Sequence, residues 1–469
     1  MKSIFSNAIL YSVSTSIVRL TLLALAIVWN IIADVDISAS WSVAVSLAPL
    51  FGFLIDASFS RSTLRLFYDI DTGDFKSDIS KFYQARPKYI LTSLALATIL
   101  ATASWDLLSG GKLNEAAYLF ALVLYGLGES NSLFYSILCR LRGEAKKLVT
   151  FRISQAFLAG TASIISYEFF DVSKPFVLFA VVYFVSSFVP HIRGFAYRSS
   201  GSTQNAGLVK DIRSYALPLT FHDLSWWLRG SSSTVIVANF FGAEETSTYF
   251  LIFTLITPLT ILISGFDQSV EGEFYRARKV GSSLSRYRDT YEALAFAIFC
   301  FFLIATTATS LSHHFFDELT STMIQNVVPI VFLIPLFHAS YSVWVKGLFY
   351  RKMSKSILTG TLSGSVIGIA LSWVLTDSFG YTGAAIAALF AFACIALYVL
   401  IVSSIYDQRP IAVFYPSFLL VLSIAYSLLT QILAANLQVT VWMSLALFGA
   451  MLSLSAGVLV LLKYQRARR

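Results

Sequence analysis

Two arginines stand within stretches of sequence that are apolar enough to cross a lipid bilayer. Arg19 lies in residues 8–33, and Arg229 lies in residues 214–240. A charge near the middle of a spanning helix costs about 2.5–3.5 kcal/mol on insertion scales, so it usually faces a partner or a cavity. A planar guanidinium binds phosphate oxygens in pairs, and two of them favour a phosphate-bearing ligand. The alternative is that each arginine pairs with a buried carboxylate and only locks helices together.

Three further ionisable residues share these apolar surroundings. His222 and Asp223 precede Arg229 by one to two helical turns, where they could contact the same ligand, relay protons or bind a coupling cation. The histidine could also simply complete a polar network. Glu129 stands among small and polar residues in the segment YGLGESNSLFYS. It could form an ion site or supply the counter-charge of Arg19, and we favour the counter-charge.

The composition indicates an integral membrane protein. The chain has 469 residues, of which 57% are hydrophobic and 13% are charged, whereas soluble domains carry about 25% charged residues. The three cysteines, Cys139, Cys300 and Cys394, lack the spacing of a metal site. The sequence has no P-loop, HExxH or GxSxG motif, so we expect neither an enzyme nor a bound metal or cofactor.

Apolar segments of roughly 20 residues predict an all-α protein with about fourteen transmembrane helices. These segments are residues 8–33, 39–59, 87–108, 115–138, 148–169, 175–192, 214–240, 246–270, 290–311, 323–346, 356–376, 380–404, 411–434 and 439–462. Of the 34 Lys and Arg residues, 29 fall in the connections on one side of this layout, and only Lys112 and Lys174 fall on the other. Because cytoplasmic loops carry the excess of Lys and Arg, both termini are predicted to be cytoplasmic. These basic residues would anchor the loops next to anionic lipid, which explains the net charge of +8. No nucleic-acid partner is therefore expected.

The charged residues also suggest an internal repeat. Arg19 and Arg229 are 210 residues apart, and Asp56 and Asp267 are 211 residues apart. Both halves have six spans, so the repeat is a parallel one. The predicted organisation is an N-lobe of six spans, a cytoplasmic linker, a C-lobe of six spans, and two final spans with a basic tail. These parts are residues 1–192, 193–213, 214–404 and 405–469.

Asp56 and Asp267 lie near the predicted cytoplasmic ends of spans two and eight. Arginines follow both aspartates, at Arg61, Arg65, Arg276 and Arg278. Salt bridges between the lobes would make these residues a cytoplasmic gate. The alternative is local pairing of each aspartate with the loop that follows it.

The layout of six, six and two spans resembles the multidrug/oligosaccharidyl-lipid/polysaccharide exporter superfamily. Within it, the chain is similar to polysaccharide flippases of the Wzx type. The similar stretches are residues 213–258, with a Tyr-x-x-Pro opening and a Phe-Gly-x-x-x-x-x-x-Tyr junction, and FGYTGAAIAALFAF at 379–392. The resemblance implies two six-helix lobes around a central cavity, with Arg19 and Arg229 at positions that the family associates with an anionic lipid-linked substrate.

This resemblance predicts an inner-membrane flippase that moves an undecaprenyl-diphosphate-linked oligosaccharide to the periplasmic leaflet by alternating access. Its partners would be the polyprenyl-linked glycan, membrane lipids and the glycan polymerase with its chain-length machinery, as in O-antigen and lipopolysaccharide biosynthesis. A flippase for the lipid-linked peptidoglycan precursor is an alternative. A different class is an H⁺- or Na⁺-coupled exporter of drugs or metabolites, in which Asp223 or Glu129 would bind the ion.

Overall fold

Every regular element in the described part of the chain is a helix, which confirms the all-α fold class. The computed structural model describes residues 2–60, 62–63, 75–103, 105–109, 113, 116–170, 173–191, 206–280, 285–309, 318–351, 353–406, 414–436, 448–459 and 462. The chain forms two compact units, Met1–Leu251 and Ile252–Arg469.

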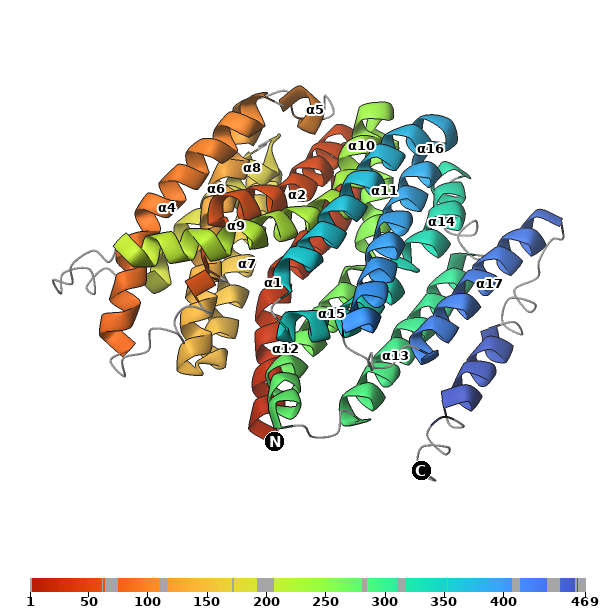
Figure 1. Cartoon of the computed structure of the whole chain (residues 1–469). Coiled ribbons are helices and arrows are strands. Elements are labelled where there is room, and N and C mark those ends of the chain that lie inside the picture. Colours follow the sequence, from red (N-terminus) through yellow and green to blue (C-terminus); the bar gives the residue numbers. More distant parts are fainter. Residues whose placement is uncertain are drawn as a thin grey trace. The chain divides into compact units, whose positions relative to one another are not determined.

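The first unit contains the helices drawn from red to green in Figure 1. They are α1 (Lys2–Ile32), α2 (Val35–Asp56), α4 (Phe75–Ala103), α5 (Trp105–Ser109), α6 (Ala116–Arg142), α7 (Ala145–Phe170), α8 (Pro175–Ser187), the 3-10 helix η1 (Val189–His191), α9 (Ala206–Arg229), α10 (Ser232–Phe240) and most of α11 (Ala243–Thr254). Helix α9 begins inside the predicted linker, and both α9 and α10 pack on α2. The predicted boundaries of the two lobes stay a prediction, whereas the compact units divide at Leu251.

The second unit contains the remaining helices. They are α12 (Thr257–Val280), α13 (Ser285–Thr309), α14 (Glu318–Val331), α15 (Ile334–Tyr350), α16 (Ser354–Tyr406), α17 (Phe414–Asn436) and a short apolar helix at Phe448–Leu459. Among the described residues of the whole chain, six helical stretches are long and apolar enough to cross a membrane. The chain is therefore a multi-pass membrane protein, and the count of fourteen spans stays a prediction.

Three of the predicted spans are broken rather than continuous. Span seven is interrupted at Gly230 and Ser231, between α9 and α10. Span eight is interrupted before Thr257, and span ten before Ile334. Each break falls beside residues that weaken a helix: Gly and Ser in the first, and a proline just inside the following helix in the other two, Pro258 and Pro335. Such breaks are tolerated in a membrane only where the freed backbone groups find protein or water.

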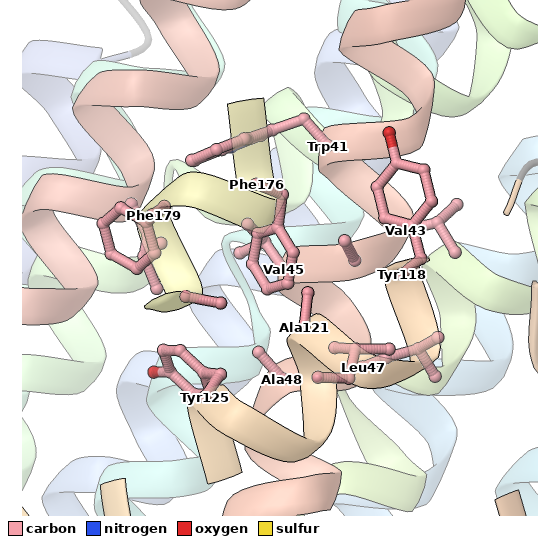
Figure 2. Close-up of a cluster of buried hydrophobic side chains, with 14 of the residues drawn as sticks. Trp41, Val43, Val45, Leu47, Ala48, Tyr118, Ala121, Tyr125, Phe176 and Phe179 are labelled. Atoms are coloured by element: carbon pink, nitrogen blue, oxygen red, sulfur yellow. The ribbon is translucent and has the colours of Figure 1, made fainter. Parts of the chain in front are cut away.

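The core of the first unit lies where α2, α6 and α8 pack together (Figure 2). Aromatic rings of α6 and α8 stack on one another, with Tyr125 and Tyr183 centroids 4.9 Å apart. Two glycines of α6 allow this close packing. A Cβ atom at Gly126 would lie 2.9 Å from the backbone of Phe51 in α2, and one at Gly128 would lie 3.0 Å from Phe184 in α8.

Helix α16 is a hairpin of two antiparallel arms that meet at Gly380. This glycine has φ 64° and ψ −152°, a conformation that a side chain would strain. The arms pack through small residues, because Cβ atoms at Gly364 and Gly368 would lie 2.5 Å from Ile395 and Ala391. Close approach through small residues is a common way for helices to associate in lipid. The hairpin corresponds to the two predicted spans at 356–376 and 380–404.

Candidate functional site

An ion pair between a buried arginine and a partly buried glutamate joins α6 to α7 in the first unit. Arg152 Nη2 lies 3.1 Å from Glu129 Oε1, and Arg152 Nη1 lies 3.2 Å from Glu129 Oε2. The pair is therefore bidentate, which is the strongest geometry for a guanidinium and a carboxylate. Tyr183 from α8 donates its hydroxyl hydrogen to the same Glu129 Oε2. Both carboxylate oxygens of Glu129 are thus engaged.

Arg152 connects four helices of this unit. Besides Glu129 of α6, its guanidinium donates to the Tyr183 hydroxyl of α8 at 2.8 Å, to Gln155 Oε1 of α7 at 3.3 Å, and to the Ser14 carbonyl of α1 at 3.4 Å. The side chain is only 3% exposed. Arg152 is not among the site residues predicted from the sequence, although the sequence carries a signal for it. It is one of only three Lys or Arg residues outside the predicted connections, together with Arg19 and Arg229.

Arg19 lies in α1 and has a different environment. Its side chain is exposed, and it forms no hydrogen bond or ion pair with any residue that the structure describes. It lies within electrostatic range of Glu129 and Tyr125 on α6. Glu129 is therefore the ion-pair partner of Arg152 and a more distant negative charge for Arg19. An exposed guanidinium in a helix of a membrane protein is available to an anionic ligand.

His222 and Asp223 are buried on α9. The Ser58 hydroxyl donates to Asp223 Oδ2 at 2.8 Å, which links α9 to the turn that follows α2. The indole Nε1 of Trp226 donates to His222 Nε2 at 3.3 Å, so this ring nitrogen acts as an acceptor. Trp227 adds a second link to α2, donating to the Ser46 carbonyl at 2.7 Å. These bonds hold α9 on the first unit.

Arg229 is the last residue of α9, immediately before the break at Gly230. A cation at the carboxyl end of a helix interacts favourably with the helix dipole. Its Cζ atom lies 3.5 Å from the centroid of the Trp226 ring, within the distance of a cation–π interaction. The side chain is only 2% exposed. In this conformation Arg229 is therefore covered, while Arg19 is accessible.

The two aspartates predicted to form a gate have different partners. Asp56 is buried at the end of α2 and accepts hydrogen bonds from Ser60 Oγ at 2.7 Å and from Ser130 Oγ at 3.0 Å. Asp267 on α12 forms an ion pair with Lys346 Nζ of α15 at 3.2 Å, and Tyr291 of α13 donates to it at 3.3 Å. The predicted gate partners Arg61, Arg65, Arg276 and Arg278 have side chains outside the described part, so the gate stays a prediction.

Lys346 is one of the 29 Lys and Arg residues that are predicted to lie in the connections on one side of the layout. The residue lies within α15 and is only 4% exposed. No cluster of three His, Cys, Asp or Glu side chains suited to a metal ion occurs among the described residues. The buried charges of this part include ion pairs and hydrogen-bonded carboxylates.

No protein-family model matches the sequence, and the search of curated proteins gives no match. Solved membrane transporters nevertheless share the fold. A multidrug resistance MATE family transporter of the MOP superfamily in its inward-facing conformation covers 87% of this chain and 95% of its own, with a TM-score of 0.58 and 12% identity. An outward-facing conformation covers 87% of this chain and 96% of its own, with a TM-score of 0.56 and 16% identity. The chain therefore has a transporter fold.

A second solved structure is similar over nearly the whole chain. The lipid II flippase MurJ, in an inward closed conformation, covers 98% of this chain and 100% of its own, with a TM-score of 0.68 and 13% identity. At this identity the similarity establishes the fold alone. The share that the MATE structures leave uncovered is about the size of the two predicted C-terminal spans, residues 405–469.

Proposed function

We propose that this protein is a flippase for a lipid-linked oligosaccharide and that Arg19 contacts the diphosphate of the polyprenyl carrier. The observation that carries the proposal is the state of Arg19, which is exposed and has neither a hydrogen bond nor an ion pair within the described residues. Leaving a guanidinium without a direct hydrogen-bonding partner in a spanning helix is costly, so a ligand that binds it directly is expected. Diphosphate oxygens suit the planar donor fork of arginine.

Arg229 and His222 are proposed as further substrate contacts in another conformation. Both are buried at the end of α9 here, and Arg229 stacks on Trp226. The solved MATE structures of similar fold include inward-facing and outward-facing conformations. In our proposal, release of α9 from α2 uncovers Arg229 so that it joins Arg19 at the head group. The glycan then occupies an aqueous space, while the polyprenyl tail stays in lipid.

The similarity to the lipid II flippase MurJ supports a lipid-linked substrate, because that solved protein covers nearly the whole chain. The carrier and repeat unit of a surface polysaccharide such as O-antigen, a cytoplasmic location of both termini, and cooperation with a glycan polymerase remain parts of the proposal. Their basis is the sequence resemblance and the distribution of Lys and Arg.

A cation-coupled exporter is the second candidate, and the similarity to MATE transporters favours it. Its ion site would lie at Asp223 rather than Glu129. Both oxygens of Glu129 are occupied by Arg152 and Tyr183, whereas Asp223 Oδ2 has a neutral hydroxyl donor in Ser58. A cationic substrate would, however, be repelled by Arg19.

The test is complementation of a strain that lacks this protein and therefore accumulates the lipid-linked intermediate on the inner leaflet. Arg19→Ala should abolish surface glycan and accumulate the intermediate at normal protein level, and Arg19→Lys should retain part of the activity. Lys147→Ala is the matched control, since the Lys147 side chain is 67% exposed and its ion pair with Glu144 is a surface pair. Full export by Arg19→Ala would overturn the proposal.

A further inference from the structure

Arg19 belongs to a group of three charges, within the described residues, that do not balance. Arg19 and Arg152 each carry one positive charge, and Glu129 is the carboxylate within electrostatic range of both. Tyr183 and Gln155, which complete the hydrogen bonding of the pair, are neutral. The group formed by Arg19, Glu129 and Arg152 therefore has a net charge of one positive unit. Coulomb interactions are strong where water is scarce, so this surplus acts on any nearby anion.

Glu129 is held too firmly to neutralise Arg19 directly. Its two oxygens receive hydrogen bonds from both terminal nitrogens of Arg152, at 3.1 and 3.2 Å, and one also receives the Tyr183 hydroxyl. Its Cγ atom lies against α2, 3.4 Å from where a Cβ of Gly52 would be. The carboxylate thus lowers the potential at Arg19 from a fixed position and leaves the guanidinium free to bind a ligand.

We propose that Glu129, fixed by Arg152 and Tyr183, sets the strength with which Arg19 holds the anionic head group. This inference rests on the proposed function and assigns a positioning role to residues that do not touch the substrate. A transport site must bind its ligand tightly enough to load and weakly enough to release it. The fixed carboxylate moderates the attraction of Arg19 for a diphosphate and thereby speeds release.

Gln155 provides a way to vary this charge while Arg152 keeps its partners. Its Oε1 atom lies 3.3 Å from Arg152 Nη1, on the same guanidinium that binds Glu129. Glu129→Gln raises the net charge of the group by one unit, and Gln155→Glu lowers it by one unit. The double variant Glu129→Gln/Gln155→Glu moves the carboxylate to the other side of Arg152 at constant net charge. All four side chains are nearly isosteric. Gln155→Glu nevertheless loses the hydrogen bonds that Gln155 Nε2 donates to the Tyr183 carbonyl and to Ser132 Oγ, both at 3.0 Å, so the sign of the Glu129→Gln effect and the salt dependence carry the test.

The experiment measures binding of farnesyl diphosphate, a short polyprenyl diphosphate, to the purified full-length protein in detergent by titration calorimetry at low and high salt. Relative to the wild type, we expect Glu129→Gln to bind about threefold to tenfold more tightly and Gln155→Glu to bind more weakly by a similar factor. The double variant should bind like the wild type. The differences should shrink at high salt, because exposed charges are screened.

The outcomes separate the inference from the proposed function. Retained binding by Arg19→Gln, or no binding by the wild type, would count against the proposed function itself. If Arg19→Gln loses binding but the two single variants match the wild type, the charge-setting role is overturned. A purely structural role of the pair predicts weaker binding in every variant, whatever the sign of the charge change. Should Glu129→Gln fail to fold, the salt dependence of Gln155→Glu decides the question, because a loss of affinity caused by charge shrinks at high salt and a purely structural loss does not.

Discussion

The carboxylates of the two compact units are held in different ways. In the first unit, Glu129 meets the planar fork of Arg152 through two oxygens, and Asp56 is satisfied by serine hydroxyls. In the second unit, Asp267 meets the ammonium of Lys346 through one oxygen. Asp56 and Asp267 are related by the sequence offset, yet their partners differ in type.

The Glu129–Arg152 ion pair of the first unit has no charged counterpart at the equivalent positions of the predicted repeat. An offset of 210 residues, which relates Arg19 to Arg229, carries Glu129 to Ala339 and Arg152 to Leu362. The corresponding positions in the second half are therefore uncharged. The comparison indicates that the first unit pairs its carboxylate with a planar arginine fork, whereas the second unit pairs its carboxylate with a lysine, which offers no such fork.

Among the variants that test this comparison, Arg152→Leu should lower the stability of the protein most. It leaves Glu129 without its guanidinium, and breaking one side of a buried ion pair costs roughly 3–5 kcal/mol. We expect a marked fall in the thermal unfolding midpoint of the detergent-solubilised protein. The double variant Glu129→Gln/Arg152→Leu should recover part of the loss, because no uncompensated charge remains. Equal stability of Arg152→Leu and the wild type would show that the pair contributes nothing to the fold.

A smaller effect is expected in the second unit for Lys346→Met. The substitution keeps the length and apolar stem of the side chain but removes the 3.2 Å ion pair with Asp267. Because the ammonium meets Asp267 through one oxygen rather than as a fork, and Tyr291 continues to donate to that carboxylate, the loss should be about 1–3 kcal/mol. The measurement is again the unfolding midpoint. A loss equal to that of Arg152→Leu would contradict the distinction between the two units.

Exchanging the cations sharpens the same comparison. Arg152→Lys keeps the charge but cannot reach both Glu129 oxygens as a fork, so it should retain only part of the stability. Lys346→Arg inserts a larger planar group into a site that is 4% exposed, and it should also destabilise the protein. Arginine and lysine are not interchangeable at bidentate or buried sites. If neither substitution changed the unfolding midpoint, charge alone, without geometry, would hold these helices together.

The sequence predicted the helical class and the intramembrane charges, but not which charges meet. Arg19, Arg229 and Glu129 were identified because each interrupts an apolar run. Arg152 interrupts a run in the same way and was missed, since it lies close to a predicted end of span five. Lys346 was placed in a connection because helix ends cannot be located to better than a few residues from apolar runs alone.

Prolines inside spans seven, eight and ten predict kinks or breaks there, but hydropathy alone does not locate them, for a physical reason. A hydropathy pattern reports how apolar a segment is, and a short break does not change that average. The position of Arg229 at the end of α9 depends on the break at Gly230. Its burial against Trp226 depends on tertiary packing, which single-sequence patterns do not encode.

A modest effect is expected where Asp56 meets neutral donors. Ser130→Ala removes the 3.0 Å hydrogen bond from Ser130 to the Asp56 carboxylate, and it also removes a 3.2 Å acceptor of Arg86. Hydrogen bonds to charged groups contribute roughly 1.5–3 kcal/mol, but Ser60 continues to donate to Asp56. The loss should therefore fall near the lower value. Ser136→Ala, on the same helix and also buried, is the control and should change the unfolding midpoint less.

The smallest effect should have the opposite sign, at the residue after Asp56. Ala57 has φ 42° and ψ 42°, and Ser58 has φ 55°. The left-handed conformation costs an alanine roughly 1–2 kcal/mol, whereas glycine adopts it freely at an entropic cost of about 0.5–1 kcal/mol. Ala57→Gly should thus stabilise the protein by roughly 0.5–1 kcal/mol. Ser58→Gly is not an equivalent test, because it also removes the hydrogen bond to Asp223.

The matched control for Ala57→Gly is Ala48→Gly, in the regular part of α2. There the same substitution should destabilise the protein by about 1 kcal/mol or more, because a helical glycine gains no relief of strain. Destabilisation by both variants would mean that the turn after α2 is not strained. Strained backbone persists where the surrounding structure imposes it, often at moving parts. If the turn stores strain that helps release α9, Ala57→Gly should slow transport as well as raise the unfolding midpoint. If the turn is static, only the unfolding midpoint should change. Both quantities are therefore measured on the same variant.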